Sequence, residues 1–397
     1  MIYEENVVCL QKFPVMIKRI LQSWITKKMF NRKAIILIGP RQVGKSTLVD
    51  SILQDYEDVL ILNGDDPAIQ KLMDRPNTEQ LRNIIGKTKV LFIDECQRIS
   101  EIGLTSKIIT DHFKDVQLIL SGSSSFDLQN RTSEPLTGRK WTAMMWPVSW
   151  HEWQNYAGYV KSQQDLSNRL VYGFYPDVLM NSHAASDVLV ELTDSYLYKD
   201  ILTFSNIRKP DEVRNLVQAL AWQVGSEVSY REVSQLCGLD PKTVASYIDI
   251  LEKAFVIFRL PSYSRNLRNE IKEGRKIYFY DNGIRNAAIG QLQPFDLRTD
   301  KGALWENFLM SERKKLLSYS KSSATSYFWR TTAQQEIDYV EELQGELSAF
   351  EFTFNPKRKK AIPSTFSSNY NISGTIIHSD NFRDFIMPPE LTKMYEM

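Results

Sequence analysis

The residues with the clearest chemical signature form the string Gly39-Pro-Arg-Gln-Val-Gly44-Lys45-Ser46-Thr47. Two glycines separated by four residues let a loop wrap its backbone N–H groups around phosphate at the start of a helix. In such a loop the Lys45 ammonium reaches the β- and γ-phosphates, and the Ser46 hydroxyl is a ligand for Mg²⁺. An apolar run precedes the string and a helical pattern follows it, as this loop requires. The alternative is a glycine-containing surface turn. The residues expected at the nucleotide are Gly39, Pro40, Arg41, Gln42, Val43, Gly44, Lys45, Ser46 and Thr47.

Two carboxylates, Asp94 and Glu95, follow the apolar run 90–93. A strand that ends in Asp places a carboxylate beside the phosphate loop, where Asp94 can complete the Mg²⁺ shell. The adjacent Glu95 can orient and activate the attacking water. Taken without the loop, the same pair indicates only a solvated strand end.

Polar residues after the run 116–120 extend the expected catalytic set. Ser121 and Ser123 are placed to sense the γ-phosphate, or else to cap the next helix. In ring-forming ATPases an arginine further on reaches the nucleotide of a neighbouring subunit, which makes Arg131 and Arg139 candidates. The alternative for both is a solvated charge. The sequence thus predicts Glu95, Lys45, Ser121 and Arg139 as catalytic residues.

Short apolar runs position these residues. Four of these runs are rich in Val, Ile and Leu: 34–38, 59–62, 90–93 and 116–120. A fifth run, 141–145, ends at Pro147, and helical patterns alternate with the runs. This alternation predicts buried parallel strands in an α/β domain. The run 59–62 falls between the two motifs, as in P-loop ATPases whose motif strands are separated by an inserted strand. Four tryptophans, Trp141, Trp146, Trp150 and Trp153, are expected to pack this domain, with base stacking as the alternative.

Residues 15–155 resemble an AAA-type ATPase domain through the strings Gly-Pro-Arg-Gln-Val-Gly-Lys-Ser-Thr, Ile-Asp-Glu-Cys-Gln and Leu-Thr-Gly-Arg139. The chain is similar to a bacterial and archaeal family of ATP-binding proteins in which this domain precedes a C-terminal domain of unknown function. The family's later motifs match at residues 198–201, 280–283, 305–308 and 336–338, so the resemblance extends to about residue 360. It implies binding of ATP and Mg²⁺ and leaves the physiological substrate undefined.

The middle of the chain resembles a helix-turn-helix. Two helical patterns, 230–237 and 241–254, are joined by Gly238-Leu-Asp240, and Ser229 can cap the first of them. The runs 255–260 and 276–280 would form a wing hairpin. An outward face of Lys242, Thr243, Ser246 and Tyr247 could contact DNA. Its single lysine also suits a protein-docking module.

Three acids near the C-terminus, Glu306 on a helix and Asp338 and Glu351 on a hairpin, resemble the PD-(D/E)xK nuclease core. In that core the carboxylates hold Mg²⁺ and a lysine two residues after the last acid positions water. Here Thr353 stands at the lysine position, and Lys357 is the candidate substitute. Cleavage is therefore not expected. The basic run 357–360 is expected to be a solvated loop, with phosphate contact as the alternative.

Composition limits the class of protein. The 397 residues predict two or three domains, and 43% hydrophobic with 24% charged residues excludes a disordered or fibrous chain. The net charge of +1 excludes a bulk polycation. Three scattered cysteines and four scattered histidines give neither zinc spacing nor a disulfide framework. With neither a signal-peptide pattern nor an apolar run of membrane length, a cytoplasmic protein without membrane contact is expected.

The resulting prediction is an AAA-type P-loop domain at 1–155, a helical lid or connector at 156–220, a winged-helix-like domain at 221–290 and a nuclease-like α+β domain at 291–397. The P-loop domain is expected to have a parallel sheet with helices on both faces. The predicted function is Mg²⁺-dependent ATP hydrolysis that moves the C-terminal domains and acts on nucleic acid, through either the winged helix or the tail. The alternative is a nucleotide-dependent protein-interaction switch with a degenerate, non-cleaving tail. An ATP-gated nuclease is the third hypothesis. Oligomerisation stays open.

Overall fold

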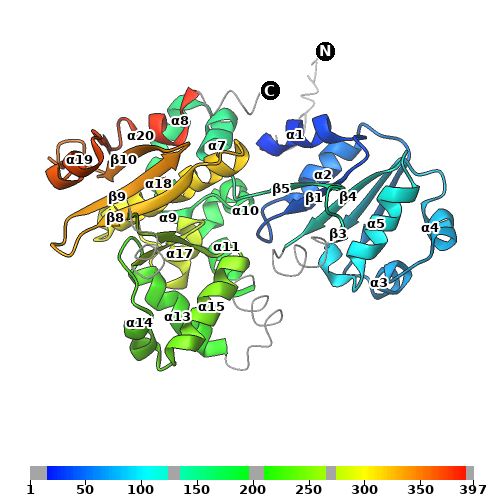
Figure 1. Ribbon diagram of the computed structural model, residues 1–397, viewed down its shortest axis with the longest axis horizontal. Helices are drawn as coiled ribbons and strands as arrows, with labels where there is room; N and C mark the ends of the chain where they lie inside the picture. Colours follow the sequence, from blue (N-terminus) through cyan, green and yellow to red (C-terminus); the bar gives the residue numbers. More distant parts are fainter. Residues whose placement is uncertain (1–15, 124–134, 196–209, 265–273, 390–397) are drawn as a thin grey trace, which may run out of the picture.

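A five-stranded parallel sheet forms the centre of the N-terminal lobe in a computed structural model that describes residues 16–123, 135–195, 210–264 and 274–389 (Figure 1). Three of the strands are almost fully buried, as the continuous apolar runs predict. The strand order is β2-β3-β4-β1-β5. The bounds are β1 Ala34–Ile38, β2 Val59–Asn63, β3 Val90–Asp94, β4 Gln117–Gly122 and β5 Lys140–Met144.

Strand β4 separates β1, which leads into the phosphate loop, from β3, which ends at Asp94. The prediction that residues 59–62 form this separating strand was wrong. Strand β2 instead pairs with the far side of β3, at the edge of the sheet. Strand β4 pairs in parallel with both motif strands, with Ile36 opposite Leu120 and Phe92 opposite Ile119. Position along the chain does not determine neighbours in a parallel sheet, because helical crossovers can pass over intervening strands.

Helices cover both faces of this sheet, as predicted. The chain crosses the sheet in one direction from β1 to β2 and in the opposite direction from β2 to β3 and β4. Because each crossover is right-handed, α2 lies on one face and the helices that follow β2 lie on the other. Figure 1 shows α1 and α2 on one side and α4 and α5 on the other. The bounds are α1 Ile20–Lys28, α2 Lys45–Leu53, α3 Pro67–Met73, α4 Thr78–Ile85 and α5 Ile102–His112.

A helical region follows and leads into two helices and a hairpin. Residue Gly238 ends α14 at a φ of 65°, and Asp240 caps the start of α15, as the turn signals indicated. Strands β6 and β7 pair antiparallel. The bounds are α7 Trp150–Ala157, α8 Tyr159–Gln164, α9 Leu166–Tyr172, α10 Pro176–Met180, α11 Ala185–Leu192, α13 Pro210–Trp222, α14 Tyr230–Cys237, α15 Pro241–Lys253, β6 Ile257–Pro261, β7 Arg275–Phe279 and α17 Asn282–Ala288.

The C-terminal part is a long helix against a small mixed sheet of order β11-β10-β9-β8. The predicted hairpin turns at Gln344 and Gly345, both at positive φ. Strand β11 pairs in parallel with β10 and was not predicted. The bounds are α18 Lys301–Tyr319, β8 Thr325–Arg330, β9 Glu336–Leu343, β10 Glu346–Phe352, α19 Ser364–Tyr370, β11 Thr375–Ile377 and α20 Phe382–Ile386. Within the described ranges no helix combines the length and apolar character needed to cross a bilayer.

Tryptophans join the two lobes. The Trp146 ring, directly after β5, stacks on Tyr280 with centroids 4.6 Å apart. Trp150 is fully buried among phenylalanines of the C-terminal lobe, and Trp153 is 5% exposed. Packing is therefore the role of the Trp150 and Trp153 rings, and base stacking is wrong for these two. Trp141 differs, because it lies on the edge strand β5 with the ammonium groups of Lys28 and Lys33 over its ring.

A buried aspartate fastens the helical region to the hairpin. Asp281, which is 3% exposed, accepts hydrogen bonds from the backbone N–H groups of Gly283 and Ile284 at 2.8 and 3.2 Å and so caps α17. Its second oxygen accepts from the N–H of Phe174 at 2.7 Å, 107 residues away. One carboxylate thus satisfies the backbone of two separate segments.

Replacing Asp281 with Ala should lower the free energy of unfolding of the C-terminal lobe by about 2–4 kcal/mol, because a helix cap is lost and a buried N–H is left unpaired. Urea denaturation measures the change. The control is Asp296→Ala, which removes an exposed carboxylate from the same lobe. Equal stability of the two variants would contradict the bridging role of Asp281.

Candidate functional site

The predicted phosphate loop joins the end of β1 to the start of α2. Gly44 is the N-cap of α2 at a φ of 89°, and Gln42 also has a positive φ of 57°. Alternation of these conformations turns successive N–H groups toward one point and forms an anion-binding nest at a helix N-terminus. At Gly39 a Cβ atom would lie 2.0 Å from the carbonyl oxygen of Met145, so the loop's entry has room only for glycine.

Lys45 is buried beneath this loop. Its Nζ donates hydrogen bonds to the carbonyl oxygens of Gly39 and Pro40 at 3.0 and 2.7 Å, and its side chain is held inside the turn. Burial lowers the pKa of Lys45 to about 8, although the charges of Glu95 and Asp94 oppose the shift. A nucleotide phosphate would give the ammonium a charged acceptor in place of neutral carbonyls.

Three oxygen-bearing side chains from neighbouring elements converge at the carboxyl edge of the sheet. The Ser46 hydroxyl donates to Asp94 Oδ2 at 2.6 Å, and the Ser121 hydroxyl donates to Oδ1 of the same carboxylate. Ser121 lies inside β4, which excludes the helix-cap alternative for it. The pair of hard oxygen donors, a serine hydroxyl and an aspartate carboxylate, fits Mg²⁺, which keeps waters and binds nucleotide phosphates alongside few protein ligands. Among the described residues no group of three or more His, Cys, Asp or Glu side chains is arranged to hold a metal ion.

Glu95 has a strained backbone at this edge. Its φ of 46° and ψ of 37° lie in the left-handed region, which is costly for a residue with a side chain. Its carboxylate accepts from Gln97 Nε2 at 2.5 Å and from the Ser123 hydroxyl at 3.3 Å. These two polar residues therefore hold Glu95 in place. Sequence analysis did not assign a role to Gln97.

An apolar cavity of about 350 Å³ lies beside the loop. It is lined by Val43, Gly44 and Thr47 on one side and by Pro176 and Met180 of α10 on the other. Its volume and lining suit the nucleoside part of a nucleotide. Helix α10 belongs to the predicted connector 156–220, so part of this segment borders the cavity beside the phosphate loop.

A buried arginine that the sequence analysis missed ties the loop to its surroundings. Arg19 donates to the carbonyl oxygens of Val43 and Trp146, each at 2.6 Å, and pairs with Glu152 at 3.1 Å. Glu152 also accepts from the backbone N–H of Ile20. The three partners lie 24, 127 and 133 residues from Arg19 along the chain, so no local pattern marks it.

Of the two arginine-finger candidates, the structure describes Arg139. Arg139 precedes β5 at the amino edge of the sheet, opposite the phosphate loop, where its backbone carbonyl accepts from Ala34. Its guanidinium pairs with Asp111 at 2.6 Å. Contact of Arg139 with the nucleotide of a neighbouring subunit stays a prediction. Arg131 and the family motif at 198–201 lie outside the described residues.

The tail acids converge, and lysines bind them. Lys276 of β7, 1% exposed, lies 3.2 Å from Glu306 Oε1 and also pairs with Glu336. The Tyr278 hydroxyl donates to Glu306 at 2.7 Å. Burial raises the pKa of Glu306, and Lys276 opposes that shift. This contact joins the hairpin to α18 and β9.

A second lysine bridges the other two acids. Lys360 donates to Asp338 Oδ2 at 2.5 Å and pairs with Glu351. Burial, followed by the charge of Asp338, raises the pKa of Glu351 to about 8, while Lys360 opposes the shift. The candidate substitute Lys357 was wrong, because it is exposed and only its backbone N–H bonds to Asn355. The solvated-loop interpretation also fails for Lys360.

The three tail carboxylates are neutralised by lysines. Glu306, Asp338 and Glu351 each pair with a lysine ammonium, which a divalent ion would have to displace from the carboxylate oxygens. The predicted inactivity of the tail as a nuclease is consistent with this arrangement and stays a prediction.

Comparison with known families covers most of the chain. Residues 31–154 match the model of an AAA domain, residues 163–294 a domain of unknown function (DUF8612) and residues 301–384 a second domain of unknown function (DUF4143). The chain carries an AAA ATPase domain followed by two domains of unknown function. The DUF8612 match runs across residue 220, where the sequence predicted a boundary, and the predicted boundaries stay predictions.

The chain is similar to proteins of bacteria and archaea. An uncharacterized protein of Haemophilus influenzae is 25% identical over 64% of this chain and 69% of its own length. An uncharacterized protein of Mycobacterium tuberculosis is 23% identical over 82% of this chain and 71% of its own, and one of Methanocaldococcus jannaschii is 21% identical over 75% and 70%. The solved Walker-type ATPase PABY2304 of Pyrococcus abyssi covers 69% of this chain and 96% of its own, at 14% identity and a TM-score of 0.49.

The affinity for ATP should fall as pH rises above 8. Without nucleotide the pKa of Lys45 is about 8, and phosphate binding requires the charged ammonium. The dissociation constant for ATP should therefore rise roughly tenfold between pH 7 and 9. Calorimetric titration with ATP in EDTA measures this without Mg²⁺. In Lys45→Arg the charge persists through this range, and its profile should be flat. A flat profile for the wild type would contradict the assignment.

Proposed function

We propose that this protein hydrolyses ATP in a Mg²⁺-dependent reaction and uses the cycle to move its C-terminal lobe. The observation that carries the proposal is the convergence of Ser46, Asp94 and Ser121 next to the nest at the start of α2. In the proposed complex Lys45 binds the β- and γ-phosphates, and Ser46 and Asp94 hold Mg²⁺. The ion neutralises phosphate charge as the transferred group leaves. Ser121 keeps the Asp94 carboxylate oriented.

Glu95 is the proposed base that orients and activates the attacking water. Its bonds to Gln97 and Ser123 hold the carboxylate at the edge where the γ-phosphate would end. The strained backbone fixes its direction, since the left-handed conformation turns the chain sharply after β3.

Replacing Glu95 with Gln should lower kcat for ATP hydrolysis about 10²- to 10³-fold and leave ATP affinity within a few-fold of wild type. The control is Glu101→Gln, which removes a carboxylate paired with Arg75 on the surface of the same domain. Phosphate release and calorimetric binding give the two readouts. Unchanged turnover in Glu95→Gln would refute the role of Glu95 while leaving nucleotide binding intact.

Motion of the C-terminal lobe is supported by two contacts. The Arg19 guanidinium bonds to both the phosphate loop and the backbone of Trp146, whose ring stacks on Tyr280. Residues of α10 line the cavity beside the loop. A shift of the loop on nucleotide binding would therefore reach the hairpin through Arg19 and the stacked rings.

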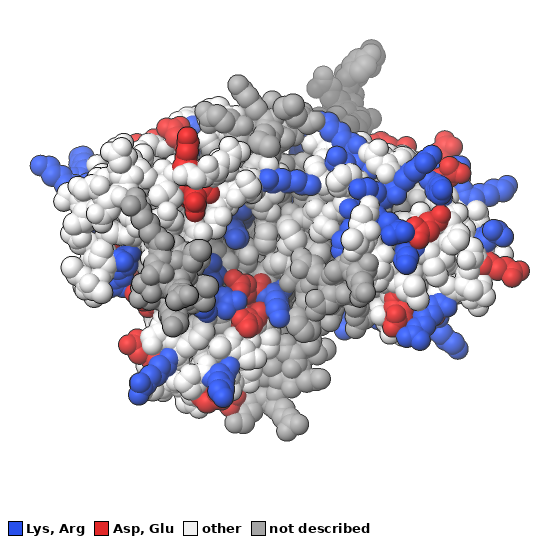
Figure 2. Space-filling model, viewed as in Figure 1, with Lys and Arg blue, Asp and Glu red and all other residues white. Residues whose placement is uncertain are grey.

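Nucleic acid is the proposed partner, and a surface here called the α1–β5 basic surface supports it. The Nζ atoms of Lys28 and Lys33 lie 4.4 and 4.3 Å from the Trp141 ring centroid, and Lys321 Nζ lies 4.0 Å from that of Trp24. Within the described part of the chain, none of these three lysines forms an ion pair with a carboxylate. Burial and the charge of Lys28 lower the pKa of Lys321, a sign of uncompensated positive charge. Figure 2 shows blue side chains over α1.

The two helices and hairpin of the middle region resemble a winged helix, which we propose as a further nucleic-acid module. Its second helix is poorly suited to phosphate along its C-terminal half, because Asp249 and Glu252 lie there and pair with Arg259. The α1–β5 basic surface is therefore the better-supported contact. Combined lysines and aromatic rings suit a phosphate backbone and its bases.

Charge reversal tests this contact. Lys28→Glu combined with Lys321→Glu should weaken binding of a fluorescent 20-nucleotide DNA at least tenfold and reduce the slope of log K against log salt by about two. The control, Lys71→Glu, reverses an exposed lysine on α3. Anisotropy titrations with single-stranded and duplex DNA supply the measurement. Equal binding by both variants would refute the surface as a DNA contact.

A nucleotide-dependent protein-interaction switch is the second candidate. Two large apolar side chains of the middle region support it, since Trp222 is 59% and Leu236 is 69% exposed. Exposed rings and aliphatic chains of this size favour protein contacts. ATP hydrolysis together with failure of DNA binding by the wild type would favour this candidate.

A further inference from the structure

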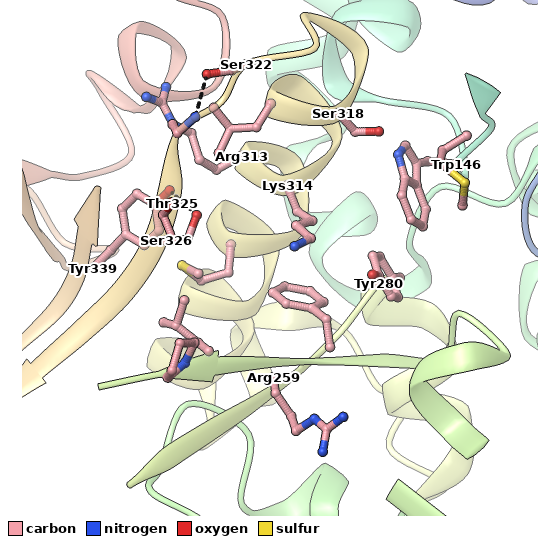
Figure 3. A pocket seen from close by; sticks show the side chains of 17 residues that line it. Trp146, Arg259, Tyr280, Arg313, Lys314, Ser318, Ser322, Thr325, Ser326 and Tyr339 are labelled. Atoms are coloured by element: carbon pink, nitrogen blue, oxygen red, sulfur yellow. Dashed lines mark hydrogen bonds between the residues drawn. The ribbon is translucent and has the colours of Figure 1, made fainter. Parts of the chain in front are cut away.

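A cavity of about 480 Å³ lies where the two lobes meet, apart from the nucleotide site. It is enclosed by the end of β5, the β6–β7 hairpin, α18 and the start of β8 (Figure 3). We call it the junction cavity. Its volume is that of a site for a small organic ligand.

One side of the junction cavity is aromatic. The rings of Trp146 and Tyr280 stack with an interplanar angle of 12°, and the ring centroids of Phe258 and Tyr280 are 4.9 Å apart. The opposite side carries hydroxyl groups of Thr325 and Ser326. A ligand with a flat apolar body and a polar end would match both sides.

Lys314 is the charged group between these two sides. Figure 3 shows its ammonium nitrogen inside the cavity, with Trp146 and Tyr280 on one side and Ser326 on the other. Burial lowers the pKa of Lys314, and the charge of Glu252 only partly opposes the shift. The ammonium is therefore desolvated, which disfavours its charged form unless an anion is bound.

The other cations of the cavity wall already have partners. Arg313 pairs with Glu341 at 2.6 Å, and Arg259 pairs with Asp249 at 2.8 Å. Of the carboxylates in the described ranges, none lies within 4.0 Å of Lys314 Nζ, which lies over the Phe258 ring, 5.7 Å from its centroid. Lys314 is thus the wall cation whose charge an incoming anion would neutralise.

We propose that the junction cavity binds a small organic anion that carries an aromatic ring. Its acidic group pairs with the Lys314 ammonium and accepts hydrogen bonds from the hydroxyl side. Its ring packs against the wall formed by Trp146 and Tyr280. This binding site does not depend on the proposed ATP hydrolysis, because the phosphate loop and its ligands are not part of the cavity.

The probe is 8-anilinonaphthalene-1-sulfonate, an aromatic monoanion whose fluorescence rises on binding. The full chain is titrated in the presence of saturating Mg²⁺-ATP, which keeps the probe out of the nucleotide site. The wild type should show one saturable site. Lys314→Met should weaken the affinity at least tenfold, and Lys314→Arg should retain it within a few-fold.

The matched control is Lys301→Met. Lys301 lies on the same helix with its ammonium over an aromatic ring, 5.5 Å from Phe295, but outside the cavity. Its affinity should equal that of the wild type. The neutral analogue N-phenyl-1-naphthylamine has the same ring body without the sulfonate, and it should not distinguish wild type from Lys314→Met.

Two results would overturn the proposal. One is equal sulfonate affinity in wild type and Lys314→Met, and the other is loss of affinity in Lys301→Met to the same extent as in Lys314→Met. Circular dichroism melting of each variant shows that it is folded, and Lys314→Arg keeps the test decisive if Lys314→Met unfolds.

Discussion

The buried Arg19 guanidinium is the interaction on which the arrangement of the nucleotide site depends. It lies just before α1, yet its hydrogen bonds join the phosphate loop, the segment after β5 and the cap of α7. A buried charge is costly unless it is paired and hydrogen-bonded, and Glu152 together with two carbonyl oxygens gives each of the three guanidinium nitrogens an acceptor. Because the planar guanidinium has fixed donor directions, these segments can meet in few relative positions. The loop is thereby held before nucleotide arrives.

The same network gives the protein a physical route between its lobes. Trp146 is held by Arg19 through its carbonyl oxygen and by Tyr319 of α18 through its N–H, while its ring packs on Tyr280. Parts of the AAA domain, the hairpin and the long helix therefore share one residue. Through these shared contacts a change in the loop would reach the C-terminal lobe, as the proposed use of hydrolysis requires.

The C-terminal acids illustrate how neighbours change the chemistry of a motif. Their order along the chain resembles a nuclease core, but Lys276 and Lys360 neutralise them. Lysine ammonium groups paired with buried carboxylates hold the hairpin, α18, β9 and β10 together. The arrangement serves packing between segments and leaves few oxygens for a metal ion.

Sequence alone determined the local features whose signals are short. The strand runs, the phosphate loop, Asp94 and Glu95 at the end of β3, and the turns at Gly238 and Gly345 follow from apolar patterning and from residue-specific backbone preferences. These depend on neighbours within a few positions, so one sequence suffices to predict them.

Only the tertiary structure decided which distant residues meet. In the structure β4 lies between β1 and β3, and Arg139 lies at the edge of the sheet opposite the phosphate loop, where it pairs with Asp111. Lys360, and not Lys357, pairs with the tail acids, and Arg19 bonds to the phosphate loop. The crossover path of the chain and the partners of buried charges are properties of the packed whole. Short sequence patterns do not show them, because the groups that satisfy these buried cations lie well outside any local motif, 30 residues apart for Lys276 and Glu306 and 133 for Arg19 and Glu152.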